Sequence, residues 1–125
     1  MNTIGTALAS ADKADPELAA DVVRAALEPF FCIADTFTDS LARLTGDAQK
    51  AVKTTAFDLQ VNPVNPGLSF HKLDKARDRN FWSVRVSSDI RLIVHKTAGS
   101  LMLCYADHHD KAYDWAERRK LEVHP

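Results

Sequence analysis

The stretch FWSVRVSSDIRLIVHK, Phe81–Lys96, decides the fold because it predicts two strands and the turn between them. Side chains alternate between the two faces of a strand, so a shift of one residue in the pairing exchanges the faces. A turn at Ser87–Asp89 makes one face of this hairpin wholly apolar, whereas a shorter turn would mix Arg91 and His95 into that face. We therefore prefer the turn at Ser87–Asp89. The apolar face then consists of Trp82, Val84, Val86, Ile90, Leu92 and Val94.

The opposite face of the hairpin carries two arginines. The preferred pairing places Arg85 directly opposite Arg91, with Ser83, Ser87, Ile93 and His95 around them. His95 is expected to lie at the periphery of this group. Like charges directly opposite each other destabilise a sheet. We expect the pair to bind an anion, because a function would offset this cost; the alternative is that each arginine pairs with a surface carboxylate. Helices must cover the apolar face, so the arginine face is expected to be open.

Length and charge narrow the class of protein. A chain of 125 residues predicts one domain with a substantial core. No apolar run approaches the ~20 residues of a membrane helix, and the first residues lack the pattern of a signal peptide, so we expect a cytoplasmic protein with no membrane partner. Residues 1–69 carry 5 Lys+Arg and 9 Asp+Glu, whereas residues 70–125 carry 11 and 8. The basic half contains the arginine pair, which favours an anionic partner there.

The order of the predicted elements indicates an α+β fold, with two helices on one face of a small, mainly antiparallel sheet. Residues 1–29 are predicted to form an N-terminal leader with one helix, and residues 30–125 a compact domain. The leader helix, Pro16–Glu28, starts after an N-cap aspartate and has an apolar stripe. The elements that follow are a strand at Phe30–Ala34, helices at Thr36–Leu44 and Ala48–Gln60, the hairpin, a strand at Leu101–Asp107, and a last helix from Lys111 that Asp110 caps. Asp35 or Thr36 is expected to cap the first of the two middle helices, and Asp47 the second.

The predicted core joins the two helices to the apolar face of the hairpin. Cys32 and Cys104 each lie inside an apparent strand, and both are predicted to be small buried residues rather than a disulfide or metal ligands. The charged stretch KLDKARDR, Lys72–Arg79, is predicted to be a solvated loop. The core is predicted to include Leu41, Val52, Leu59, Trp82, Val84, Ile90, Leu92 and Val94. Tyr113 and Trp115 lie two residues apart on the last helix and cannot share a face, so Trp115 is predicted to be the one that packs in the core.

From Phe30 onward, the order β-α-α-β-β-β-α resembles the RelE/ParE superfamily of bacterial toxins and toxin-like proteins. The strongest local similarity is VRVSSDIRLIVHK, followed by LMLCYADHHDKAYDWAERR, and the resemblance covers roughly residues 30–121. That superfamily includes ribosome-dependent messenger RNA endonucleases, DNA gyrase inhibitors and members with no activity. Similar segments also precede helicase-like polypeptides of the UvrD/Rep type, which implies an accessory role as an alternative.

The resemblance also implies which residues form the site. In the RNA-cleaving branch, basic residues on the second and third strands hold the scissile phosphate, and Arg85 and Arg91 fall at such positions. His108 and His109 follow the last strand, where that branch has a basic or acid–base residue. The predicted catalytic residues are Arg85, Arg91, His109 and Tyr113, and the predicted RNA or phosphate ligands are Lys72, Arg85, Arg91 and His108.

Two functions remain open from the sequence. The first is a ribosome-dependent messenger RNA endonuclease of a toxin–antitoxin system, with messenger RNA and an antitoxin protein as partners. The second is a non-catalytic module that regulates gyrase or a helicase-like partner, which the near-neutral charge and the non-basic Ser83 favour. The leader helix is expected to pack either on its own domain, as a cover, or on a second copy of the chain, which would form a homodimer. No cofactor is predicted, and the adjacent histidines lack the spacing of a metal site.

Overall fold

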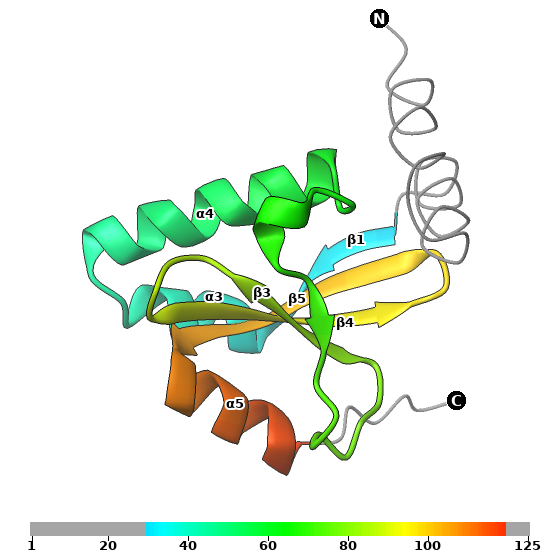
Figure 1. Ribbon diagram of the computed structural model, residues 1–125. Coiled ribbons are helices and arrows are strands. Elements are labelled where there is room, and N and C mark those ends of the chain that lie inside the picture. The colour runs from blue at the N-terminus through cyan, green and yellow to red at the C-terminus, as the bar shows by residue number, and fades with distance from the viewer. Residues whose placement is uncertain (1–29, 120–125) are drawn as a thin grey trace, which may run out of the picture.

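The computed structural model describes residues 30–119 and has an α+β architecture. Helices α3 (Asp35–Ala42) and α4 (Gly46–Val61) cover one face of a five-stranded sheet, and α5 (His109–Arg118) lies against the other face (Figure 1). The predicted leader helix, Pro16–Glu28, lies outside the described residues. Within residues 30–119, no helix is long and apolar enough to cross a membrane.

The sheet is antiparallel except at one edge. Its strands lie in the order β1-β5-β4-β3-β2, and only β1 and β5 pair in parallel. The sequence predicted four of these strands, and the short β2 is additional. A short 3₁₀ helix, Pro66–Leu68, precedes β2. The strands are β1 (Phe30–Ile33), β2 (His71–Lys72), β3 (Phe81–Arg85), β4 (Ile90–Thr97) and β5 (Ser100–His108).

The predicted pairing of the hairpin is confirmed. Arg85 lies directly opposite Arg91, and Trp82 lies opposite Val94. The apolar face packs under α3 and α4, and the predicted core residues all belong to this cluster, with Leu41 and Trp82 partly buried at its margin. Its buried members are Phe37, Val52, Leu59, Leu68, Val84, Ile90, Leu92, Val94, Leu103 and Ala106.

Threonine hydroxyl groups form hydrogen bonds at the starts of the first two helices, and only the one at α4 is a helix cap. The hydroxyl of Thr45 accepts a hydrogen bond of 3.2 Å from the Ala48 amide, so Thr45 caps α4 and the predicted cap, Asp47, lies in the first turn. The predicted cap of α3, Asp35 or Thr36, is also wrong. Thr36 instead donates a hydrogen bond of 2.6 Å to the Cys104 carbonyl, which ties the start of α3 to β5.

A β-bulge in β5 changes which side chains face each helix layer. Ile93 pairs with Tyr105 and Val94 pairs with Leu103, so Cys104 is the extra residue. As a result, Cys104 and Tyr105 both face α5. The buried Ser40 hydroxyl accepts a hydrogen bond of 3.0 Å from the Ala106 amide beside the bulge. No feature of the sequence predicted this irregularity.

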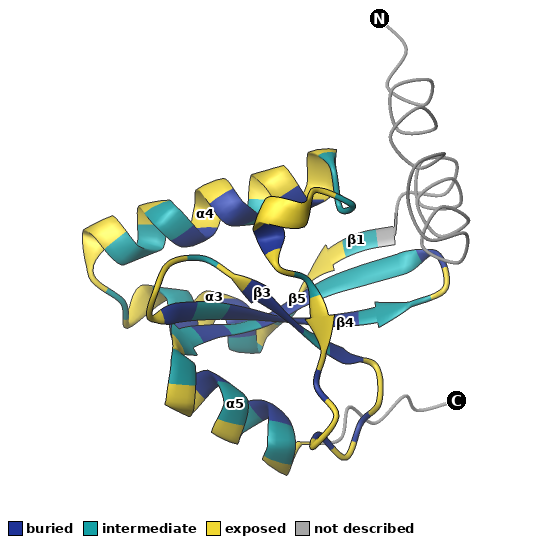
Figure 2. Ribbon diagram, in the orientation of Figure 1, coloured by how far each residue is buried: buried dark blue, intermediate teal, exposed yellow. Residues whose placement is uncertain are grey.

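The prediction of an open arginine face is wrong for most of the hairpin. Ser83 and Ile93 are buried against α5, through the Tyr113 hydroxyl and the apolar cluster of this helix, and His95 is buried against Phe81 and Asp78. Figure 2 shows α5 below strands that are largely coloured as buried. The small residues of α5, Ala112 and Ala116, are fully buried and allow the helix to approach the sheet closely.

The charged stretch Lys72–Arg79 is also more ordered than a solvated loop. Its residues Leu73, Ala76 and Asp78 are buried, and an Asp78 carboxylate oxygen lies 3.1 Å from Nε2 of His95. This contact joins the loop to the sheet under Phe81, whose ring packs edge-on against His95. His95 is therefore an interior residue, and its predicted peripheral position is wrong.

The two cysteines have different environments. Cys104 is buried, and this burial raises the pKa of its thiol to about 12. Cys32 is exposed, so its predicted burial is wrong, because it lies on the edge strand β1. Both thiols are free, as predicted.

We expect Leu92→Ala to destabilise the protein by about 3 kcal/mol, because it removes a fully buried side chain from the centre of the hairpin. The matched control is Val61→Ala, on the exposed surface of α4, which should change the free energy of unfolding by less than about 0.5 kcal/mol. Urea unfolding of both variants measures the difference. Equal effects would contradict the assigned core.

We expect a thiol reagent at pH 8 to modify Cys32 rapidly in the folded protein, while Cys104 reacts only after denaturation. The reason is that the thiolate is the reactive form, and burial suppresses it at Cys104. Mass spectrometry of the labelled chain before and after denaturation measures this, with Cys32→Ser as the control. Fast labelling of folded Cys32→Ser would contradict the burial of Cys104.

Candidate anion-binding site

The arginine pair lies where the hairpin extends beyond the part that α5 buries. Arg85 is the last residue of β3 and is exposed, and Arg91 near the start of β4 is partly exposed. Asp107 of β5 lies opposite Arg91 on its other side, so the row across the sheet reads Arg85, Arg91, Asp107. Within residues 30–119, neither arginine forms an ion pair with a carboxylate at 4 Å or less. This geometry does not support the alternative that each arginine serves a surface salt bridge.

The backbone of the hairpin turn holds the Arg91 guanidinium. Its Nη1 atom donates hydrogen bonds of 2.7 Å to the Ser87 carbonyl and 3.1 Å to the Ile90 carbonyl. Both bonds use the same nitrogen, so the donors on the other two nitrogens remain for a ligand. A guanidinium offers paired donors that match the oxygens of phosphate. Arg91 is thus partly preorganised for an oxyanion.

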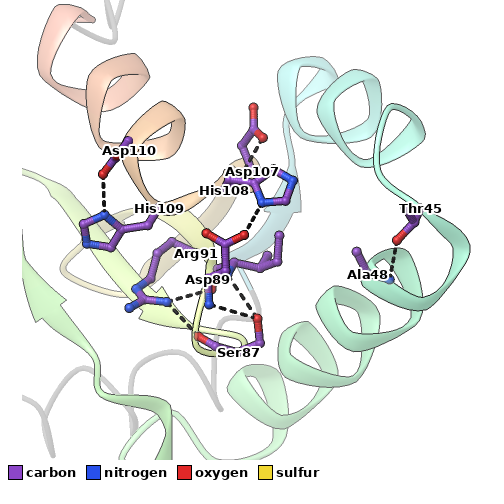
Figure 3. Close-up of polar contacts among 10 residues, drawn as sticks. Thr45, Ala48, Ser87, Asp89, Arg91, Asp107, His108, His109 and Asp110 are labelled. Carbon is purple, nitrogen blue, oxygen red and sulfur yellow. Dashed lines mark hydrogen bonds and ion pairs between the residues drawn. The ribbon is translucent and has the colours of Figure 1, made fainter.

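The start of α5 lies against the tip of the hairpin (Figure 3). The Asp89 carboxylate accepts a short hydrogen bond from Nδ1 of His108, and the Asp89 carbonyl accepts one of 2.6 Å from the His109 amide. The His108 hydrogen bond is the main reason that the pKa of the Asp89 carboxyl group is lowered. The predicted cap of α5 is therefore wrong: α5 begins at His109, and Asp110 lies in its first turn, with a carboxylate oxygen 2.9 Å from Nδ1 of His109.

His109 and Tyr113 lie one turn apart on α5 and contact each other. Their ring centroids are 4.4 Å apart, and the Tyr113 hydroxyl shares a hydrogen bond of 3.2 Å with the buried Ser83 hydroxyl. Ser83 thus fixes the tyrosine that supports the His109 ring. Trp115 lies partly buried and stacks on Tyr105 with centroids 4.6 Å apart, which is consistent with its predicted place in the core.

The structure brings together four of the predicted site residues and separates two. Arg85, Arg91, His109 and Tyr113 belong to the α5 side of the sheet, and Figure 3 shows the Arg91 and His109 side chains projecting to the same side of the hairpin tip. Lys72 pairs with Trp82, whose side chain packs in the α3/α4 core, so Lys72 belongs to the opposite face. His108 lies opposite Ile90 of the same core and also belongs to that side.

Sequence reasoning missed His71 as a neighbour of the arginine face. His71 pairs with Ser83, which places it on the α5 side, and its exposed ring bonds the Ser69 carbonyl at 3.0 Å. Nothing in the sequence indicated that β2 pairs with β3. Among the described residues, no group of three His, Cys, Asp or Glu side chains has the geometry of a metal site.

Arg85 also lines a pocket that separates the hairpin from α4. The pocket has a volume of about 530 Å³, and Lys50 and Asp58 of α4 contribute opposite charges to it. Leu68 of the 3₁₀ helix also lines this pocket. A ligand that contacts Arg85 therefore has room on the α4 side of this residue.

This arrangement is the α+β fold of the RelE-like bacterial toxins. A RelB–RelE antitoxin–toxin complex from Methanococcus jannaschii matches with 20% identity and a TM-score of 0.55, over 67% of this chain and 96% of that chain. A RelBE2 toxin–antitoxin complex from Mycobacterium tuberculosis matches with 22% identity and a TM-score of 0.51, over 63% and 88%. A copper-bound mutant toxin from Helicobacter pylori matches with 17% identity and a TM-score of 0.53, over 65% and 94%. No protein-family model matches the chain, and no curated protein does.

Proposed function

We propose that this protein is a toxin-like protein of the RelE/ParE type that binds the phosphate backbone of messenger RNA through Arg85 and Arg91. The observation that carries this proposal is the direct opposition of two arginines that form no ion pair within the described part of the chain. Opposed like charges cost stability, whereas a phosphate between them converts the repulsion into charge-assisted hydrogen bonds.

The proposed reaction is cleavage of RNA by its own ribose. A base removes the proton of the 2′-hydroxyl, the oxygen attacks the neighbouring phosphorus, and the 5′-oxygen leaves with a proton from an acid. Arg85 and Arg91 stabilise the charge on the phosphorane-like transition state. His109 is the proposed acid or base, because an imidazole ring can donate a proton from one nitrogen and accept one at the other. Tyr113 packs against the His109 ring and limits its orientations.

We also propose an antitoxin protein as a partner. Two of the similar structures are complexes of a toxin with its antitoxin. A chain that cleaves messenger RNA would require such control, and the antitoxin would be a separate chain.

The second candidate function is a non-catalytic module that regulates gyrase or a helicase-like partner. The formal net charge of −1 favours it, since broad electrostatic attraction to RNA requires a basic surface. Ser83 favours it too. Some members of the superfamily have a basic residue at this position, whereas Ser83 is uncharged and shares a hydrogen bond with the Tyr113 hydroxyl. Induced expression in bacteria separates the two functions: loss of translation supports RNA cleavage, and DNA-damage signalling supports a gyrase-directed role.

We expect Arg85→Ala and Arg91→Ala each to weaken RNA binding by roughly 10- to 100-fold, as for loss of a hydrogen bond to a charged group. Fluorescence anisotropy with a labelled RNA at several salt concentrations measures the affinity. In each variant, the slope of log K against log salt concentration should fall by the amount expected for about one lost phosphate contact. The matched control is Arg118→Ala, which removes an exposed arginine that pairs with Asp114 on α5. Unchanged RNA binding by the Arg85→Ala/Arg91→Ala double variant would contradict the proposal that these two arginines bind RNA.

We expect His109→Ala to slow RNA cleavage by ~10²–10⁴-fold with little change in RNA affinity, as for removal of a general acid or base. Single-turnover cleavage on programmed ribosomes measures the rate, and anisotropy measures the affinity. Asp110→Asn is the control, because it removes the exposed carboxylate beside Nδ1 while leaving the ring in place. Full activity of His109→Ala would exclude the acid–base role.

A further inference from the structure

The hairpin tip connects the two chemical groups of the proposed site. On one side, the tip holds Arg91 through the carbonyl groups of Ser87 and Ile90. The turn itself is braced by the Ser87 hydroxyl, which accepts a hydrogen bond of 3.0 Å from the Ile90 amide. All these contacts are local in sequence, so they fix the guanidinium to the turn.

One residue of the same turn reaches a distant element. Asp89 contacts His108 with its carboxylate and the His109 amide with its carbonyl, at the junction of β5 and α5. The first amides of a helix have no partner within the helix, and His108, at the N-cap position, provides no side-chain cap. The Asp89 carbonyl therefore supplies an acceptor that the helix lacks.

From this geometry we propose that Asp89 is a positioning residue that ties the start of α5 to the hairpin tip and so fixes His109 relative to Arg91. The inference rests on the proposed function for its catalytic consequence. Its structural content is independent, because it concerns only which contacts hold the first turn of α5.

Burial distinguishes this role from a contribution to folding. The side chains of His108 and Asp89 are 55% and 59% exposed, and an exposed ion pair contributes little to stability. The buried residues Ala112 and Ala116 hold the rest of α5 on the sheet. Loss of the Asp89 side chain should therefore loosen the first turn of α5 and leave the fold intact.

The test is a double-mutant cycle with Asp89→Ala and His108→Ala in the full chain. We expect each single variant to speed hydrogen exchange of the His109 amide up to about fivefold, the upper range for an exposed ion pair, with unchanged thermal unfolding. The double variant should exchange no faster than either single variant, because the two side chains act through one contact. Asp114→Ala is the matched control: its carboxylate lies 58% exposed and pairs with Arg118 on the same helix.

The functional arm measures cleavage and RNA affinity of the same variants. We expect Asp89→Ala to lower kcat about tenfold with KM unchanged, because misplacement of a catalytic group lowers the rate of the chemical step. Asp89→Asn, which keeps a side-chain oxygen that accepts a hydrogen bond, should restore most of the rate. Unaltered exchange of the His109 amide in Asp89→Ala would overturn the proposal. If the unaltered protein neither binds nor cleaves RNA, the proposed function fails, and the exchange measurement still decides the role of Asp89.

Discussion

The pairing of β3 with β4 is the constraint on which the rest of the structure depends. One face of the hairpin is apolar only when the turn spans Ser87–Asp89, and burial of that face under α3 and α4 makes any other pairing costly. The same pairing places Arg85 directly opposite Arg91. The like-charge contact is thus a consequence of core packing, and the core has enough buried apolar surface to tolerate it.

On the second face of the sheet, a buried core and the candidate site share the same strands. Toward the far end of the hairpin, Phe81 and Ile93 are buried in the cluster that includes α5, and His95 is buried against Phe81 and Asp78. Helix α5 begins at His109, so it does not cover the strands near the hairpin tip. The point at which this helix starts therefore sets the border between interior and site. Asp89 lies at that border and contacts the helix from the turn.

Most of the fold was predictable because period-two alternation and helix spacing are local signals, and both kinds of signal agree in the core around Val84 and Leu92. The cover of the second face was not predictable, because α5 buries mainly alanines, whose small side chains leave little periodic signal. The bulge at Cys104 and the strand β2 depend on pairing between distant segments. Of the four site residues that belong to the α5 side, the positions of Arg85 and Arg91 follow from the register of the hairpin, whereas His109 and Tyr113 were assigned to the site through the resemblance to the RelE/ParE superfamily. Lys72 does not join them, because its face depends on the unforeseen pairing of β2.

The carboxylates near the arginine pair limit how strongly the candidate site can attract the proposed RNA ligand from a distance. Asp107 lies beside Arg91 in the same row, and Asp89 lies at the hairpin tip, so two carboxylates partly offset the arginines. The whole chain has a formal net charge of −1. Long-range attraction to RNA should therefore be weak, and screening acts over about 10 Å at 0.1 M salt. If RNA is the ligand, as proposed, its recognition depends on short-range hydrogen bonds from positioned guanidinium groups. The backbone bonds that hold Arg91 are what such a mechanism requires, because each donor that is already oriented lowers the entropy lost on binding.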